Sequence, residues 1–361
     1  MADVIIIGGG LSGLLTAREL SVAGAQVMLL ERGDVGREAS WAGGGILSPL
    51  HPWRYADAVT VLAQWSQAYY PQLAQALYTE TGIDSEWVQS GLLILGNEEL
   101  AAASAWAARF SSRIESIDLE VLQRIEPALQ PSDKNALLMP EIAHIRNPRL
   151  IKALKASLLN AGVMIKEGIE VSALSVANGA ITGVQADNRL FSADQVVVAG
   201  GAWTASLLKP TGIVLEIEPV KGQMLLFHAD PCLLAHIVLK DQCYLIPRRD
   251  GRIIVGSSME YAGFDKSTST EVQQQLQEFA SALLPELRQC RIENHWAGLR
   301  PSSPLGVPYV GAHPEVNGLY INAGHFRNGV VMGPAAARLL ADIILKRTPI
   351  VDPTPYALIR H

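Results

Sequence analysis

The N-terminal segment, residues 3–32, restricts the possible folds of this chain more than any other part. It begins with a run of β-branched residues, 4–7, which is apolar at every position, as in a strand buried on both faces. Glycines follow at once in the spacing G-x-G-x-x-G, at Gly8, Gly10 and Gly13, and open a helical stretch. A second apolar run then ends on an acidic residue. This strand–turn–helix–strand unit predicts a Rossmann-like fold, in which a parallel sheet binds a dinucleotide.

Each residue type in this unit has a physical reason. Gly8 allows a tight turn, Gly10 allows the backbone to approach a pyrophosphate, and Gly13 allows the helix to pack closely on the strand. The N-terminus of the helix offers unpaired N–H groups and a partial positive charge to the phosphates. The acidic residue, Glu31, is placed to accept hydrogen bonds from ribose hydroxyls and disfavours a 2′-phosphate. Glycine turns without a nucleotide also show this spacing, but the complete unit favours an ADP moiety.

A loop rich in small residues, 39–47, stands where a plain dinucleotide fold would begin its next helix. It contains three consecutive glycines, and small residues allow flat groups and backbone to come close together. A flavin ring system needs such contacts more than a nicotinamide does. A flexible linker would have the same composition, but the flanking Trp41 and Ile46 favour an ordered loop. A further apolar strand, 196–199, runs into Gly200, which fits either a second backbone approach to the cofactor or a simple strand end.

Composition places the chain among globular proteins and excludes several classes of partner. Its 361 residues exceed the size at which one core keeps growing, which predicts two domains. A net charge of −6 without a stripe of lysine and arginine argues against nucleic acid as a partner. No signal peptide and no membrane contact are expected, because no apolar run approaches the about 20 residues of a membrane span. Three cysteines without metal or disulfide spacing predict a cytoplasmic protein with no metal site.

Apolar periodicity predicts several further elements. Helices are expected over 56–81 and 147–160, and a last amphipathic helix is expected over 334–346. A strand interrupted by Gly91 is expected over 87–95, and the β-rich segment 213–259 predicts the sheet of a second domain.

Five segments together resemble the D-amino-acid oxidase family of flavoproteins. They are the glycine unit, the small-residue loop, the turn 196–203, the motif Trp-Ala-Gly-Leu-Arg-Pro at 296–301, and the motif Gly-His-Phe-Arg-Asn-Gly at 324–329. The resemblance covers essentially the whole chain in order. The last two motifs are specific, whereas many flavoproteins share the first. Within the family, the chain is similar to the glycine oxidases of the thiamine pathway.

The resemblance implies an α/β fold: a Rossmann-like FAD-binding domain of the D-amino-acid oxidase type, with an interleaved α+β substrate domain built on an antiparallel sheet. The FAD-binding domain is expected in three parts, 1–87, 142–213 and 301–361, and the substrate domain in two, 88–141 and 214–300. It also implies non-covalent FAD. Relatives that tether their flavin use a cysteine in the C-terminal segment, and this chain has none there.

The glycine unit and the resemblance together assign the site residues. At the cofactor we expect Gly8, Gly10, Leu11, Ser12, Gly13, Glu31, Arg32, Ala39, Ser40, Gly44, Gly45, Ile46, Val171, Gly200, His325, Phe326, Arg327, Asn328, Gly329, Val330 and Val331. At the substrate we expect Tyr244, Met259, Gly298, Arg300 and Arg327, of which Tyr244, Arg300 and Arg327 carry the catalytic role.

The chemistry of these side chains suits an amino acid. The planar guanidinium of Arg300 can hold a carboxylate through two parallel hydrogen bonds, and the Tyr244 hydroxyl can add a third. Without the resemblance, Arg300 would suit a surface ion pair and Tyr244 a core position, while Arg327 suits substrate contact or a salt bridge near the flavin. No general base converges on the site, which is compatible with hydride transfer from the α-carbon of a neutral amine to flavin N5.

The implied reaction is oxidative deamination of glycine to an imine and glyoxylate, with release of ammonia and hydrogen peroxide, feeding thiazole synthesis for thiamine. The implied partners are a small amino acid, molecular oxygen, thiazole-synthesis proteins and further copies of the chain. A D-amino-acid oxidase, a sarcosine-type oxidase or a dehydrogenase are alternatives, since one methyl group is worth only about 1 kcal/mol in a pocket. A flavin-binding module without turnover is the alternative from another class.

Overall fold

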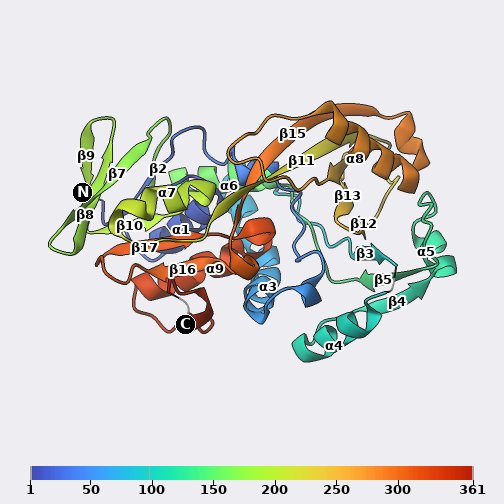
Figure 1. Ribbon diagram of the computed structural model, residues 1–361, viewed down its shortest axis with the longest axis horizontal. Coiled ribbons are helices and arrows are strands. Elements are labelled where there is room, and N and C mark those ends of the chain that lie inside the picture. Colours follow the sequence, from blue (N-terminus) through green and yellow to red (C-terminus); the bar gives the residue numbers. More distant parts are fainter. Residues whose placement is uncertain (1, 97, 360–361) are drawn as a thin grey trace.

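The computed structural model describes residues 2–96 and 98–359, and within them the strands form three sheets (Figure 1). The first sheet has the order β16-β17-β10-β1-β2-β6 and is parallel except for β16. Its strands are β1 (Val4–Ile7), β2 (Val27–Leu30), β6 (Met164–Lys166), β10 (Gln195–Val198), β16 (Tyr309–Ala312) and β17 (Leu319–Ala323). The glycine unit therefore opens a parallel sheet, as the sequence predicts.

The central strand β1 is covered on both faces. Val4 and Ile6 pack in the core formed with the helices, whereas Ile5 and Ile7 pack in the core on the other face. The helices on the first face are α1 (Leu11–Val22), α3 (Asp57–Thr81), α6 (Asn147–Asn160) and α9 (Gly329–Ile344). The second face carries α7 (Thr204–Leu208) and a three-stranded sheet of β7 (Val171–Ala177), β8 (Ala180–Ala186) and β9 (Arg189–Ser192). Burial of both faces explains why β1 is apolar without alternation.

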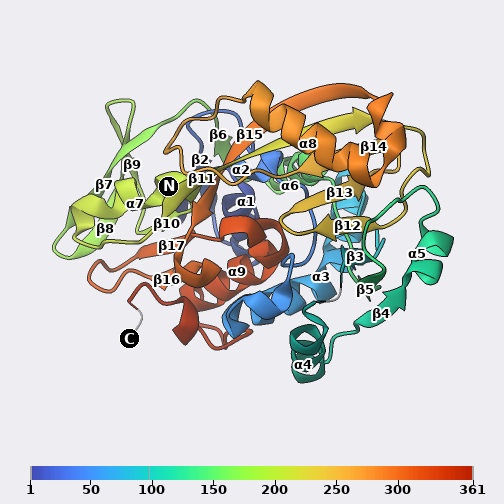
Figure 2. The same cartoon turned by 45° about the vertical axis from the view of Figure 1, so that its right-hand side comes forward.

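The second large sheet has eight strands in the order β15-β11-β14-β13-β12-β3-β5-β4 and is antiparallel except between β12 and β3. Its strands are β3 (Leu92–Leu95), β4 (Glu115–Asp118), β5 (Asn135–Met139), β11 (Glu218–His228), β12 (Ile237–Lys240), β13 (Cys243–Pro247), β14 (Arg252–Gly256) and β15 (Arg291–Ser302). The helix α8 (Thr270–Leu283) covers one face, and α4 (Leu100–Phe110) and α5 (Leu119–Ile125) lie at the far end (Figures 1 and 2).

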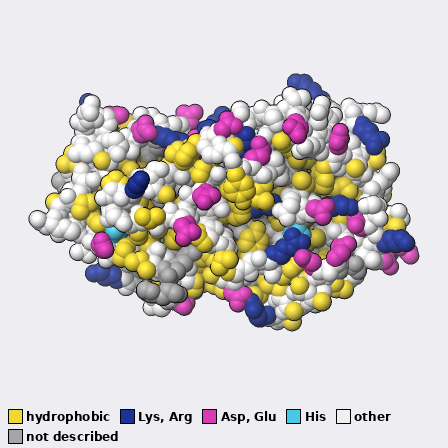
Figure 3. All heavy atoms as spheres, viewed as in Figure 1, with side chains coloured by type: hydrophobic (Ala, Val, Ile, Leu, Met, Phe, Trp, Pro, Cys, Tyr) yellow, Lys and Arg dark blue, Asp and Glu magenta, His cyan; other side chains and the backbone are white. Residues whose placement is uncertain are grey.

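The chain alternates between the two large sheets. It builds β1 and β2, crosses to β3–β5, returns for β6 and β10, crosses again for β11–β15, and returns for β16 and β17. Figure 3 shows apolar side chains near the middle of one face of the molecule, where the two sheets meet in Figure 1. Segments far apart in the sequence therefore meet at one junction.

Two expected elements differ from the structure. The last helix begins at Gly329 rather than at Pro334, although Pro334 has no N–H to donate to the Val330 carbonyl. The hydroxyl of Tyr70 on α3 donates to that carbonyl at 2.5 Å instead, so the helix continues through the proline. The strand expected over 87–95 is interrupted at Gly91, as predicted, but only the part after this glycine is a strand, β3; Gly91 has a φ of 74° and breaks the extended run before it.

Candidate active site

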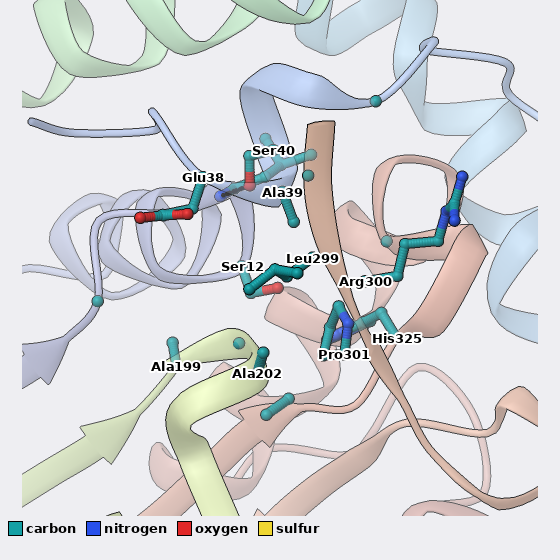
Figure 4. Close-up of a pocket in the computed structure, with 18 of the residues that line it drawn as sticks. Ser12, Glu38, Ala39, Ser40, Ala199, Ala202, Leu299, Arg300, Pro301 and His325 are labelled. Atoms are coloured by element: carbon teal, nitrogen blue, oxygen red, sulfur yellow. Dashed lines mark hydrogen bonds between the residues drawn. The ribbon is translucent and has the colours of Figure 1, made fainter. Parts of the chain in front are cut away.

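A cavity of about 460 Å³ lies at the junction of the two large sheets. Figure 4 shows residues of α1, of the short helix α2 (Ala39–Ala42), of the turn after β10 and of β15 around it. One end is formed by the glycine turn after β1 and by Glu31 after β2, and the other by side chains of the eight-stranded sheet. This position outside the carboxyl ends of parallel strands is where α/β sheets bind their ligands.

The glycine turn is as tight as its sequence predicts. Gly8 has a φ of 106°, and a Cβ there would lie 2.4 Å from the Ala199 carbonyl oxygen. A Cβ on Gly13 would lie 1.9 Å from the Gly8 carbonyl oxygen, so α1 packs directly against the turn. No side chain can be placed at either position without moving the backbone.

The N-terminus of α1 offers donors to an anion. Gly10 caps the helix, and the N–H of Leu11 donates to the Ser40 hydroxyl at 2.8 Å. Among the described residues, the N–H groups of Ser12 and Gly13 have no acceptor, and the first turn carries no acidic side chain. Unpaired N–H groups and the positive end of the helix dipole suit a pyrophosphate.

The carboxylate of Glu31 is held by backbone rather than free. One oxygen accepts from the N–H of Gly9 at 2.7 Å and the other from the N–H of Gly33 at 2.9 Å. A carboxylate oxygen can accept more than one hydrogen bond, so Glu31 keeps acceptor capacity toward the cavity that it lines. The guanidinium of Arg32 lies 3.7 Å from the ring centroid of Trp203.

The glycine loop lines the middle of the cavity. The N–H of Ile145 donates to the Gly45 carbonyl at 2.9 Å, and a Cβ on Gly45 would lie 2.0 Å from the Ile145 carbonyl oxygen. This close pairing makes the loop ordered, as its flanking residues predict. Within the described residues, the N–H groups of Gly44, Gly45 and Ile46 find no acceptor.

Three buried polar side chains beside the cavity have atoms without a partner among the described residues. They are the Oδ1 of Asn322, the Nε2 of His325 and the Nδ2 of Asn328. Burial lowers the pKa of His325 to about 4, so its ring is neutral at pH 7. Buried polar groups are normally paired, so these atoms indicate that a polar ligand belongs here.

Arg300 stands at the other end of the cavity. Its Nη2 donates to the Ser257 hydroxyl at 2.6 Å and its Nη1 to the Ser258 carbonyl at 3.2 Å, and no carboxylate of the described residues pairs with it. Burial lowers its pKa, and the nearby Tyr244 opposes that shift. A Cβ at position 222 would lie 2.1 Å from its Nη2, so Gly222 is required beneath it. A buried cation without an anion is a site for one.

Arg327 lies at the same cavity and, among the described residues, hydrogen-bonds to only one side chain. Its Nη1 donates to the Gln242 side-chain oxygen at 2.7 Å, and Gln242 belongs to the turn between β12 and β13. Within the described part of the chain it forms no salt bridge. Arg300 and Arg327 together make this end of the cavity positive.

The cavity brings together most residues singled out in the sequence. Of those expected at the cofactor, all line it except Gly13, which packs behind the turn, and Val331, which is in the helical core. Of those expected at the substrate, Tyr244, Gly298, Arg300 and Arg327 line it. Met259 does not, and its side chain is 46% exposed.

Several residues that line the cavity were not expected from the sequence. Asn322 was detectable in principle, because an amide inside the apolar strand β17 needs a polar partner. Met224 and Leu50 carry no such signal, since they look like any other core residue. Arg248, which does not line the cavity but donates to the carbonyl of the lining residue Gly44, was not expected either, because an arginine beside a hairpin turn is expected on the surface.

The fold and the cavity define a class of protein: an enzyme that binds a dinucleotide cofactor on a parallel sheet and holds an anionic substrate against it. A family described as FAD dependent oxidoreductase matches residues 3–343. The chain belongs to this family, the DAO family, and its cofactor is FAD.

Individual relatives agree with the family. A glycine oxidase from Pseudomonas putida is 46% identical over 98% of both chains. The crystal structure of glycine oxidase from Geobacillus kaustophilus has a TM-score of 0.95 at 30% identity and covers 100% of this chain and 99% of its own. A bifunctional protein ThiO/ThiG from Synechocystis is 32% identical over 97% of this chain, which spans 53% of that protein.

The residues present fit FAD. The free N–H groups at α1 suit its phosphates, the glycine loop suits a flat ring, and the unpaired atoms of Asn322, His325 and Asn328 supply further polar contacts. Cys232, Cys243 and Cys290 do not line the cavity. In the described part of the chain, no helix is long and apolar enough to cross a membrane, and no cluster of side chains could hold a metal ion.

Proposed function

We propose that this chain oxidises glycine with non-covalently bound FAD and yields an imine that hydrolyses to glyoxylate and ammonia. The observation that carries the proposal is the guanidinium of Arg300, which lines the cavity without a carboxylate partner among the described residues. A small amino acid supplies the missing carboxylate. The similarity to glycine oxidases supports glycine as that amino acid.

Arg300 and Tyr244 bind the substrate carboxylate in this proposal. The Ser257 hydroxyl and the carbonyls of Lys221 and Ser258 accept from the guanidinium of Arg300, which leaves its Nε–H and one Nη2 hydrogen for a bidentate contact. The positive charge of Arg300 and the loss of water both lower the pKa of the substrate amine, so the amine binds in its neutral form. FAD supplies the acceptor for the hydride that leaves the α-carbon.

The side chains around the cavity orient the substrate rather than remove a proton from it. His325 is neutral, and its lowered pKa of about 4 makes it a weak base. The carboxylates of Glu31 and Glu38 are engaged, the first by backbone N–H groups and the second by Arg32 and Lys266. Positioning of the α-carbon is therefore the main contribution of the protein.

The glycine oxidase relatives support a small substrate. Two glycines of the cavity wall pack closely against their neighbours, since a Cβ on Gly298 would lie 2.5 Å from the Ala42 Cβ and one on Gly44 would lie 2.6 Å from the Ile246 Cδ1. Sarcosine and small D-amino acids remain in the proposed range, because one methyl group changes binding by only about 1 kcal/mol.

The wider setting is proposed on other grounds. The chain matches about half of a bifunctional ThiO/ThiG protein, which supports thiazole-synthesis proteins as partners. Three free cysteines support a cytoplasmic location. The distribution of the strands between the two large sheets supports an FAD-binding domain of 1–87, 142–213 and 301–361 and a substrate domain of 88–141 and 214–300. Molecular oxygen as electron acceptor and a homo-oligomer are proposed from the family alone.

The test uses purified protein loaded with FAD. Glycine added without oxygen is expected to bleach the flavin, and readmitted oxygen is expected to restore the colour and release hydrogen peroxide. A panel of glycine, sarcosine, D-alanine and L-alanine ranks the substrates. A flavin that no member of the panel reduces would instead indicate a binding module without turnover, and reduction without peroxide would indicate a dehydrogenase.

A further inference from the structure

Arg248 is a buried cation with no anionic partner among the described residues. It follows β13, and only 7% of the residue is exposed. No salt bridge involves it, and its Nε has no hydrogen-bond acceptor. Burial lowers its pKa to about 10, which still leaves it charged at neutral pH. Burying an unpaired charge is unfavourable, so a role that needs the charge would explain the position.

All three of its hydrogen-bond partners are neutral. Its Nη2 donates to the Gly44 carbonyl at 2.6 Å, and its Nη1 donates to the Ile145 carbonyl at 3.2 Å and to the Nδ1 of His144 at 2.9 Å. Burial and the nearby Arg248 lower the pKa of His144 to about 3, so His144 accepts as a neutral ring. Among the described residues, the guanidinium is therefore the one charge within this hydrogen-bonded group, and the charges of Arg146, Glu86 and Asp250 act on it without a hydrogen bond.

The contact with Gly44 fixes the direction of the peptide that follows. Gly44 and Gly45 line the cavity, whereas Arg248 does not. The Gly44 carbonyl points at Arg248, and in a trans peptide the carbonyl and the N–H point in opposite directions. The N–H of Gly45 therefore points toward the cavity, where it has no acceptor among the described residues. A cation on the carbonyl side makes this N–H a stronger donor.

We infer that Arg248 is a positioning residue for the cofactor, which holds the Gly44–Gly45 peptide with its N–H toward the FAD and favours negative charge in the cavity through that peptide. The inference rests on FAD binding in the cavity and not on glycine as the substrate. If Arg248 only held the Gly44–Gly45 peptide by a hydrogen bond, a neutral donor would be enough. The experiment therefore tests the charge of Arg248.

The experiment measures the midpoint potential of FAD-loaded protein against a reference dye, together with the dissociation constant of FAD. Arg248→Gln removes the charge and keeps an amide donor, whereas Arg248→Lys keeps the charge. Arg249→Gln is the matched control, since this neighbouring arginine is exposed and pairs with Asp84. Arg248→Gln is expected to shift the dye equilibrium at least tenfold toward oxidised flavin, which is about 30 mV for a two-electron couple. Arg248→Lys and Arg249→Gln are expected to stay near wild type.

Two results would overturn the inference: an unchanged potential in Arg248→Gln, or a shift in Arg248→Lys as large as that in Arg248→Gln. If Arg248→Gln does not retain FAD, retention by Arg248→Lys supports the role of the charge, and loss by both variants contradicts it. If no amino acid reduces the flavin of the wild-type protein, the proposed function is refuted. The measurement of the potential stays valid in that case, because the dye and not an amino acid supplies the electrons.

Discussion

The two ends of the cavity recognise their ligands by different means. At the nucleotide end, the groups available to a ligand are backbone N–H groups such as that of Ser12, which lie in one short segment and need glycines around them rather than particular side chains. At the substrate end, the groups available to a ligand are side chains such as those of Tyr244 and Arg300, which lie on separate strands of the eight-stranded sheet. The first end is a property of local backbone geometry, and the second is a property of the whole fold.

This difference predicts that the two ends fail independently. A change at the nucleotide end should weaken FAD binding and leave the kinetics of FAD-saturated protein nearly unchanged. A change at the substrate end should alter the kinetics of FAD-saturated protein and leave FAD binding nearly unchanged. A variant that changes both FAD binding and the kinetics of FAD-saturated protein would contradict this independence.

The largest effect is expected for Arg300→Ala. Removal of one partner from a buried charge pair costs about 2–5 kcal/mol, which corresponds to a fall of about 30- to 5000-fold in kcat/KM for glycine. FAD binding should stay at the wild-type level, since Arg300 lies at the substrate end of the cavity. Steady-state kinetics and FAD titration measure the two quantities.

Arg291→Ala is the matched control, because Arg291 is exposed at the other end of the same strand. It should leave both quantities unchanged. A wild-type kcat/KM in Arg300→Ala would show that Arg300 does not bind the substrate. A colourless Arg300→Ala protein, which has lost its FAD, would show that the two ends of the cavity are coupled.

A smaller effect, of opposite kind, is expected for Gly13→Ala. The added Cβ would lie 1.9 Å from the Gly8 carbonyl oxygen, so the turn must move away from the phosphate position. Such overpacking costs about 1–3 kcal/mol, which predicts an FAD dissociation constant that is about 5- to 150-fold larger than in wild type. With FAD in excess, the KM for glycine should stay within about threefold of wild type.

Gly33→Ala serves as control, since its Cβ would meet nothing closer than a Glu31 oxygen at 3.9 Å. It should bind FAD as wild type does. Unchanged FAD affinity in Gly13→Ala would mean that the turn accommodates the added Cβ without weakening FAD binding.

The same contrast explains how far the sequence could predict the structure. The parallel sheet and the turn at Gly8 were predictable, because strand, glycines and helix are adjacent in the chain and each has a local physical reason. The site residues Arg300 and Tyr244 were assigned by resemblance, since nothing within a few residues of either marks it as part of a site. Their meeting depends on the pairing of β11 with β14 and β15 and of β13 with β14, which periodicity does not reveal.

Two further residues show what local patterns miss. The helix start at Gly329 depends on a hydroxyl of Tyr70, which is 260 residues away from the carbonyl that it satisfies. The burial of Arg248 depends on carbonyls of two other segments. In both cases a distant partner reverses the local expectation, that proline opens a helix or that arginine stays on the surface.

The smallest expected effect concerns pH and His325, a buried side chain that lines the cavity beside Arg300 and Pro301 (Figure 4). Its pKa in the folded protein is about 4 instead of 6.5, so below pH 6.5 the unfolded chain takes up a proton that the folded chain refuses. The free energy of unfolding therefore falls as the pH drops from 6.5 to about 4, and at pH 5.5 the loss is about 1 kcal/mol. In His325→Gln this part of the loss should disappear when denaturant unfolding at pH 7.5 and 5.5 is compared.

His51 provides the matched comparison, because burial lowers its pKa to about 4 as well, yet it does not line the cavity. His51→Gln should reduce the acid sensitivity by a similar amount, and the double variant should show the sum, since the two side chains titrate independently. FAD can change only the contribution of His325, because only His325 borders the cavity that FAD fills. An acid sensitivity in His325→Gln equal to that of wild type would mean that the folded protein protonates this ring freely, and the surroundings of His325 would then be more open to water than its burial indicates.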